Sequence, residues 1–175
     1  MMLPFASALR ATSLVAATIV ALLAATPPAG GTGGVVAVKI FAPRGSAGTR
    51  CDRVSPLTRS ARPPAVLTGA MRALLAGPTK AERRRGYGGW FSARTAGMLR
   101  SARVASGVAY VDFADFRRVI PNASSSCGSA LLLAQLNRTA TQFPTVRRAV
   151  YSFNGSRRAF YEWLQLSAPR AASHG

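Results

Sequence analysis

An apolar run near the N-terminus divides this chain into a short leader and a longer remainder. The run covers residues 14–25 and reads LVAATIVALLAA, and the residues before it carry one basic side chain, Arg10, and no acid. Proline and glycine recur over residues 27–34, where they would end a helix. A basic start, an apolar segment of about 7–15 residues and small residues after it are typical of a secretory signal peptide.

We therefore assign residues 1–30 to a signal peptide, with cleavage between Ala25 and Gly34. The alternative is an uncleaved membrane anchor, which needs about 20 apolar residues. Because the run is shorter than that, we expect export and an extracytoplasmic location. Residues 35–166 are then enough for one domain, since domains usually hold about 100–200 residues. Residues 167–175 are expected to form a flexible C-terminal tail.

The chain is strongly basic, with 23 lysines and arginines against 5 acids in 175 residues and a formal net charge of +18. Such an excess is the electrostatic signature of nucleic-acid binding. Biased composition explains it as well, since the chain is rich in Ala, Gly, Arg and Pro, and we favour that explanation. If the charge is functional, export places it beside the wall polymers and membrane headgroups of the envelope and away from nucleic acid. The candidate anion contacts are Arg83, Arg84, Arg85, Arg117, Arg118, Arg147, Arg148, Arg157 and Arg158.

Catalytic and metal-binding residue types are scarce in this sequence. The single histidine, His174, falls in the expected tail, and beside it there are only two cysteines and five acids. Two cysteines and one histidine do not make an all-protein zinc site with the usual four ligands. A Ser-His-Asp unit would have to draw on the tail. We therefore expect no enzyme activity, no catalytic residue, no metal site and no cofactor.

Export changes what the two cysteines mean. In an oxidising compartment Cys51 and Cys127 are expected to form a disulfide. The bridge would close a loop of about 76 residues and stabilise the fold by roughly 4–5 kcal/mol in the chain-entropy model. Two unpaired buried thiols are the alternative.

Patterning predicts alternating strands and helices over the remainder of the chain. Apolar residues at 67, 71, 74 and 75 share one face of a helix that opens at Pro63 and ends at Gly77. A second helix follows the N-cap candidates at 124–126 and runs to Pro144. Strands are predicted at 34–41, 51–58, 98–104, 108–113 and 149–153, the second of them weakened by Pro56. In the fourth, Ala109, Val111 and Phe113 alternate on one face, with Tyr110 and Asp112 on the other. This order favours an α+β fold, with one small mixed or antiparallel sheet and two helices packed on one face.

Two short motifs mark local turns. Thr79 and Glu82 have the spacing of a capping box, which predicts a short helical turn that ends at Gly86. Asn154 and Gly155 form the strongest hairpin signal in the chain. Residues 158–166 are then either the return strand of that hairpin or a short terminal helix.

Four collinear segments resemble the GerMN domain, which is named from sporulation and spore-germination proteins. The segment ALLAGPT at 73–79 resembles its helix-ending motif, and residues 99–113 resemble its hairpin. Residues 133–146 and 150–155 resemble its second helix and its closing strand and turn. The motif positions, all of which we interpret as structural, are Leu74, Leu75, Gly77, Pro78, Thr79, Gly86, Tyr87, Gly107, Val111, Asp112, Phe113, Phe143, Pro144 and Gly155.

The resemblance covers about residues 35–166 and implies a non-catalytic domain of the bacterial cell envelope that acts in protein interaction or assembly. Departures from the pattern at 88–95, at Asn154 and in the cysteine pair indicate a secreted single-domain member of the family, and the composition indicates an actinobacterial type. We expect an interaction module for one or more envelope proteins, with a link to sporulation or spore germination. The alternative is an arginine-rich protein that binds wall polymers or membrane headgroups.

Three remaining features have structural explanations. Asp112 is expected to accept a hydrogen bond where its strand ends at Ala114. The serines at 124–126 are better N-caps than nucleophiles, because no base lies near them in the sequence. The aromatic residues at 90, 91, 161 and 163 either pack against the core or form a patch for a glycan or a partner.

Overall fold

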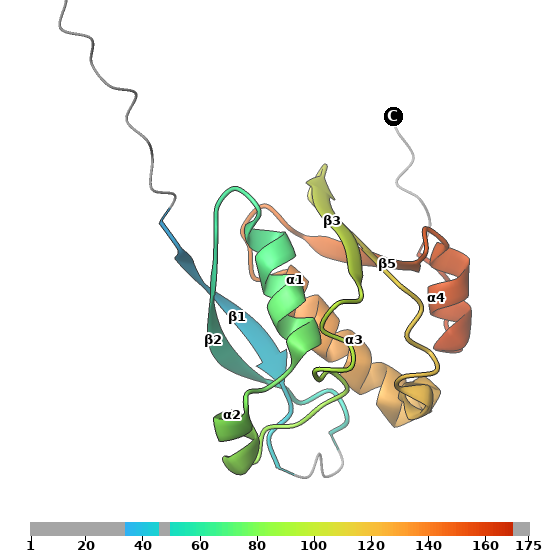
Figure 1. Cartoon of the computed structure of the whole chain (residues 1–175). Coiled ribbons are helices and arrows are strands. Elements are labelled where there is room, and N and C mark those ends of the chain that lie inside the picture. The colour runs from blue at the N-terminus through green and yellow to red at the C-terminus, as the bar shows by residue number, and fades with distance from the viewer. Residues whose placement is uncertain (1–33, 46–49, 170–175) are drawn as a thin grey trace, which may run out of the picture. The chain divides into compact units, whose positions relative to one another are not determined.

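The computed structural model describes residues 34–45 and 50–169, so the predicted signal peptide and the end of the predicted tail lie outside the described residues. The elements follow one another along the chain in the order expected of a mixed fold (Figure 1). They are β1 (Val36–Ala42), β2 (Ser55–Ala61), α1 (Val66–Ala76), α2 (Lys80–Arg84), β3 (Leu99–Ala105), β4 (Val108–Phe113), the 3-10 turn η1 (Pro121–Ser124), α3 (Ser126–Ala140), β5 (Arg148–Phe153) and α4 (Arg157–Trp163).

The α+β class is confirmed, but the strands form two sheets where a single sheet was expected. β1 and β2 make an antiparallel pair. β4 is the centre of the other sheet, antiparallel to β3 and parallel to β5. Helices α1 and α3 pack against each other, and each contacts strands of both sheets. The two helices therefore connect the sheets through side chains, without a shared ladder of backbone hydrogen bonds.

β1 pairs with β2 along one edge, and side chains at the end of α3 and just after it bond to its other edge. The N–H of Lys39 donates to Oε1 of Gln142 at 2.7 Å, and Nε2 of Gln142 donates to the carbonyl of Lys39 at 2.7 Å. Two residues on, the N–H of Phe41 donates to Oγ1 of Thr139 at 3.2 Å. The amide of Gln142 thus makes the donor and acceptor contacts that a neighbouring strand would make.

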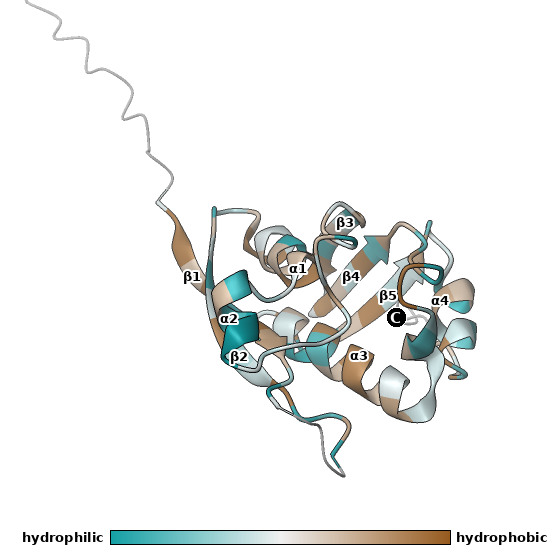
Figure 2. Ribbon diagram, turned by 60° about the horizontal axis from the view of Figure 1, so that its bottom comes forward, coloured by the Kyte–Doolittle hydropathy of each residue, from teal (hydrophilic) through white to brown (hydrophobic). Residues whose placement is uncertain are grey.

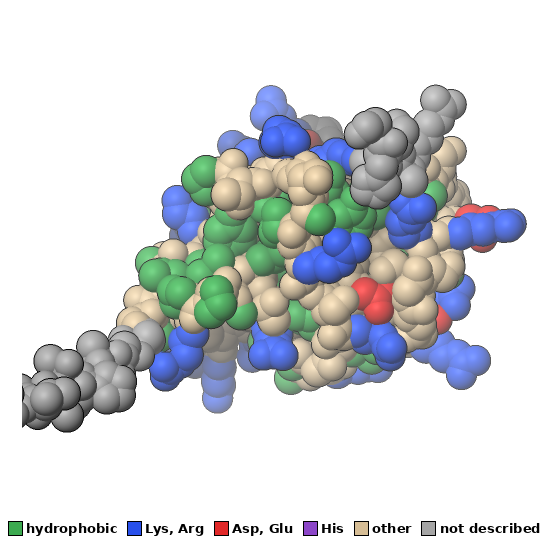
Figure 3. All heavy atoms as spheres, turned by 90° about the horizontal axis from the view of Figure 1, so that it is seen from above, with side chains coloured by type: hydrophobic (Ala, Val, Ile, Leu, Met, Phe, Trp, Pro, Cys, Tyr) green, Lys and Arg blue, Asp and Glu red, His purple; other side chains and the backbone are tan. Residues whose placement is uncertain are grey.

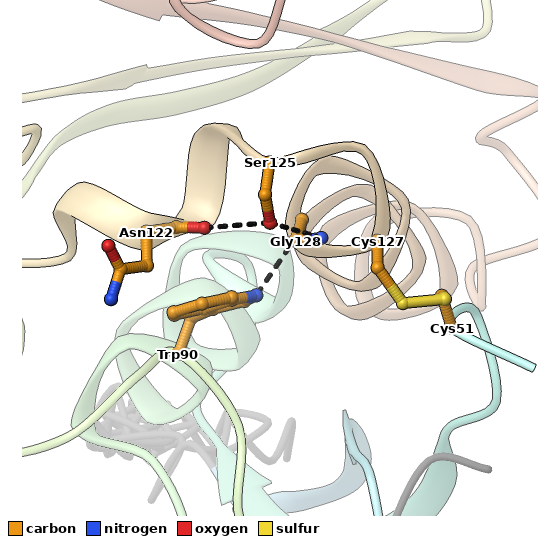
Figure 4. Close-up of a disulfide and its surroundings, with 6 residues drawn as sticks. All are labelled: Cys51, Trp90, Asn122, Ser125, Cys127 and Gly128. Atoms are coloured by element: carbon orange, nitrogen blue, oxygen red, sulfur yellow. Dashed lines mark hydrogen bonds between the residues drawn. A yellow bond between two sulfur atoms is a disulfide. The ribbon is translucent and has the colours of Figure 1, made fainter.

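The predicted second strand was placed too early in the sequence. Cys51 and Asp52 lie in a turn, and β2 begins only at Ser55. Pro56, which is expected to weaken this strand, stands second in it, and the strand lies at the edge of its sheet, where a missing N–H is tolerated. The displaced Cys51 reaches α3 and forms the predicted disulfide with Cys127, with their Cα atoms 5.1 Å apart (Figure 4).

The C-terminal segment resolves the open alternative in favour of a helix. Asn154 and Gly155 adopt positive φ angles of 47° and 84°, as the hairpin signal predicts. The chain then enters α4, whose N-cap Ser156 accepts a hydrogen bond from the N–H of Ala159 at 3.1 Å. Residues 160, 161 and 164 are buried, a spacing that fits one face of a helix.

The main core lies between β4, β5 and the helices (Figure 2). Ala109, Val111 and Phe113 point into it from β4 and are almost fully buried, while Tyr110 and Asp112 point the other way, as the alternation predicted. Eight aromatic rings form a connected cluster with centroid separations of 4.8–6.3 Å, and its members are Phe91, Phe113, Phe116, Tyr151, Phe153, Phe160, Tyr161 and Trp163. Among the described helices, none has both the length and the apolar character of a membrane span.

Candidate interaction surface

The residues of the motif at 77–82 have structural roles in the domain. Gly77 has a φ of 73°, and a Cβ there would lie 2.1 Å from the carbonyl oxygen of Phe91. Thr79 and Glu82 form the predicted capping box: Oγ1 of Thr79 accepts from the N–H of Glu82 at 3.2 Å, and the Glu82 carboxylate accepts from the N–H of Thr79 at 2.7 Å. This glycine allows a close backbone crossing, and the box starts α2.

Glu82 is also the partner of Arg59 on β2. The two side chains are mostly buried and make hydrogen bonds of 2.6 and 2.8 Å. The guanidinium of Arg59 is the main reason why the pKa of Glu82 falls from 4.5 to about 2, and the N–H of Thr79 lowers that pKa further. The most perturbed carboxylate among the described residues is therefore a structural anchor with both oxygens in use.

Asp112 anchors a turn other than the one expected for it. Its Oδ1 accepts from Oγ of Ser152 at 2.6 Å and from the N–H of Gly155 at 2.7 Å, and its Oδ2 faces Arg100 at 3.1 Å. The N–H of Ala114, the predicted partner, donates instead to the carbonyl of Met98, just before β3, at 2.8 Å. Because β4 and β5 run parallel and side by side, Asp112 reaches the end of β5 more easily than its own strand exit.

The candidate anion contacts lie at the ends of several different elements. Arg83, Arg84 and Arg85 are exposed at the end of α2, as expected for a solvated face, and Arg117 and Arg118 follow β4. The remaining four lie at the starts of β5 and α4: Arg147, Arg148, Arg157 and Arg158. Two of the nine are held by acids, because Arg117 pairs with Asp115 and Arg158 with Glu162, each at 2.5 Å. The described structure thus spreads these arginines over several elements.

The aromatic residues left open by the sequence pack against the core. Phe91 and Tyr161 are buried, and Trp90 and Trp163 are partly buried against the main core. The indole N–H of Trp90 donates to the carbonyl of Gly128 at 3.1 Å, close to the disulfide (Figure 4). These four rings therefore do not form an exposed patch.

A groove of about 400 Å³ opens where the tip of β3 meets the start of α1 and the loop before β5. We name it the α1–β3 groove. Its lining residues are Pro64, Ala65, Val66, Leu67, Thr68, Ala102, Arg103, Val104, Phe143, Pro144 and Thr145. Most of these side chains are apolar and none of the described lining residues is acidic. Viewed from this side, apolar side chains gather on the surface and lysine and arginine side chains stand around them (Figure 3).

Two residues of the lining pack on a small second core, which is formed by Val38, Ala61 and Ala70 and is separate from the main one. Val66 and Phe143 pack over this second core, and both remain partly exposed in the groove. Val104 on the rim is 42% exposed. The molecule thus presents partly covered apolar side chains to solvent at this end.

The model of the sporulation and spore germination family, Germane, matches residues 39–158. This match spans more than half of the 175 residues. The chain belongs to the Germane family. The matched region runs from β1 to the start of α4, which confirms the resemblance of the four sequence segments. The curated proteins and the solved structures gave no match.

One buried residue of this Germane domain escaped the sequence reasoning. Gln135 on α3 is only 1% exposed; its Oε1 accepts from the N–H of Trp90 and its Nε2 donates to the carbonyl of Phe41, both at 3.2 Å. A Cβ on Gly89 would lie 2.6 Å from this side chain. The sequence could have indicated this residue, because Gln135 lies beside Leu136 on the apolar face of α3, and a buried glutamine needs hydrogen-bond partners.

Proposed function

We propose that this Germane-family protein is a secreted, non-enzymatic interaction module of the bacterial cell envelope, with a role linked to sporulation or spore germination. The observation that supports the proposal most directly is the α1–β3 groove. An apolar concavity on a small domain is the kind of surface that a partner covers. Two polar side chains of the family motif, Thr79 and Asp112, are occupied by contacts within the domain, which favours a structural role for them.

Export is the part of the proposal that rests on residues 1–30 and on the cysteines. The leader has the composition of a signal peptide. A bond between Cys51 and Cys127 agrees with an oxidising compartment, where such bonds persist. Fusing residues 1–30 to a reporter that is active only outside the cytoplasm tests the leader directly, and an inactive fusion would contradict export.

Crosslinking in the native envelope tests the interaction. A photoreactive residue replaces Thr145, which is exposed in the lining of the groove, and the matched control carries it at Leu166, which is also exposed and is not part of the lining. We expect an adduct with a discrete envelope protein from position 145 and none of that mass from position 166. Absence of any protein adduct from these and further surface positions would overturn the proposed function.

Salt separates this function from the alternative of binding to anionic polymers. Binding through many arginines to wall polymers or headgroups weakens steeply as salt rises. Contacts with an apolar groove persist in salt, because burial of apolar surface does not depend on screening. Retention on purified anionic wall that disappears at high salt, without any protein adduct, would favour the alternative.

A further inference from the structure

We infer that the α1–β3 groove binds a segment of a partner protein that carries apolar side chains next to acidic ones. The inference rests on the proposed function and adds the place of contact and the chemistry of the partner. The apolar part of the match comes from Val66, Phe143 and Val104. Val66 and Phe143 pack over the buried second core and remain partly exposed themselves, and Val104 is 42% exposed. A partner side chain in the groove would remove this apolar surface from water.

The backbone of β3 favours a partner in extended conformation. Arg103 and Ala105 lie opposite Tyr110 and Val108 across a two-residue turn, so these residues exchange the ladder hydrogen bonds with β4. The residues between them direct their backbone groups away from β4, and the hydroxyl of Thr68 donates to the outward carbonyl of Ala102 at 3.3 Å. The N–H and C=O of Val104 point to the same side, beyond the start of α1, where an added segment can pair with them.

The charged side chains near the groove favour a negatively charged partner. Arg103 contributes to the lining of the groove, and its guanidinium lies over the ring of Tyr110, 4.3 Å from the ring centroid, on the face of β3 opposite to Val104. A strand added beside β3 would present side chains to both faces, apolar ones near Val104 and acidic ones near Arg103. Arg147 donates to the carbonyl of Ser106 at the tip of the β3–β4 turn. Within the described part of the chain, neither arginine makes an ion pair. Four of the five acids pair with other arginines, namely Glu82, Asp112, Asp115 and Glu162, and the fifth, Asp52, pairs with neither Arg103 nor Arg147. An acidic segment would meet these guanidinium groups in the complex. A second copy of this chain would bring a charge of +18 against another +18, which disfavours self-association.

The shape of the site favours a protein segment over a lipid bilayer. The site is hollow, with a volume of about 400 Å³, and is lined from three separate parts of the chain. A hollow accepts side chains that project from a partner, whereas binding to a bilayer requires apolar side chains that project from the protein. Anionic vesicles are therefore the counter-test.

Selection from displayed peptides tests the inference without knowledge of the partner. Random displayed peptides are selected for binding to the protein, which is purified after export. The affinity of each enriched peptide is then measured for the wild type and for the variants Val104→Glu and Arg103→Glu. The matched controls are Leu166→Glu, because Leu166 has the same 42% exposure as Val104, and Arg94→Glu, because Arg94 is also an exposed arginine. We expect enriched peptides that combine apolar residues with Asp or Glu. Val104→Glu should weaken their binding about tenfold or more, as expected from loss of one buried apolar contact, and the control variants should bind as the wild type does.

Several results would overturn the inference. The first is no enrichment of any peptide, and the second is enrichment of basic peptides. The third is unchanged peptide binding by the Val104→Glu protein, provided that this variant has the same thermal midpoint as Leu166→Glu and is therefore folded. Val104→Ser repeats the test if the glutamate variant does not fold. Binding to phosphatidylglycerol vesicles that Val104→Glu abolishes would make the groove a membrane contact instead. If peptide selection fails but the crosslinking experiment still yields a protein adduct, the proposed function stands and only this site is wrong.

Discussion

The carboxylate of Glu82 accepts hydrogen bonds of 2.6 and 2.8 Å from the guanidinium of Arg59, and this pair ties the short helix α2 to the edge strand β2. Both side chains are mostly buried, so solvent screens the pair less than it screens a surface pair. The same carboxylate closes the capping box with Thr79. One acidic residue thus fixes the position of the family segment that follows α1.

The depressed pKa of Glu82 makes the stability of the protein sensitive to acid. A folded pKa of about 2 against an ordinary value of 4.5 means that the pair stabilises the fold fully above pH 4.5 and progressively less as the pH falls toward 2. The shift corresponds to about 3 kcal/mol. Urea unfolding at a series of pH values should show Glu82→Gln less stable than the wild type near pH 7, with the difference shrinking below pH 4. Glu162→Gln, which breaks an exposed pair, should change stability by less than about 0.5 kcal/mol.

Alanine variants of Gly77 and Gly155 allow the cost of backbone strain to be measured apart from the cost of a steric clash. Both have positive φ, but a Cβ on Gly77 would meet the carbonyl of Phe91, while one on Gly155 has no described atom within 4 Å. We expect Gly155→Ala to lower the free energy of unfolding by about 1 kcal/mol and Gly77→Ala to lower it by more than about 2 kcal/mol. Chemical denaturation of both variants checks this. Equal losses would mean that the crossing at Phe91 relaxes without cost.

Asp112→Asn should destabilise the turn after β5. Ser152 and Gly155 would lose a charged acceptor, and hydrogen bonds to charged groups contribute about 1.5–3 kcal/mol each. Asp115→Asn is the control, because Asp115 bonds only to Arg117 among the described residues, two positions away. Amide exchange at Gly155 should accelerate in the first variant and not in the second. An unchanged exchange rate there would contradict the anchoring role.

Reduction of the bond between Cys51 and Cys127 should lower the free energy of unfolding by about 4 kcal/mol in the chain-entropy model. The bond joins the loop before β2 to the first turn of α3, and Cys127 is exposed, so a soluble reductant can reach it. The double variant Cys51→Ser with Cys127→Ser should match the reduced protein in urea unfolding and should not respond to reductant. A stable reduced protein would show that the bond is dispensable.

Local signals in the sequence predicted local structure well. The apolar face of α1, the capping box at Thr79 and the alternation in β4 all depend on residues a few positions apart. The turn at Asn154 was also predicted, but the helix that follows it depends on the burial of Phe160 against the core, which no hairpin rule contains.

The features that sequence reasoning missed depend on contacts between distant residues. The division into two sheets follows from contacts such as that between Lys39 and Gln142, which are 103 positions apart. The partner of Asp112 depends on the parallel register of β4 and β5. The α1–β3 groove is assembled from three stretches of chain, and no one of them carries a signature of binding.

The amide of Gln142 has a consequence for how the protein behaves when crowded. Unpaired strand edges are where sheets of neighbouring molecules join and grow into aggregates. At Lys39 that growth would first require a side chain of the same molecule to be displaced from two hydrogen bonds of 2.7 Å. Gln142 thus opposes edge-to-edge assembly at β1. At the tip of β3, by contrast, an added strand has no such side chain to displace.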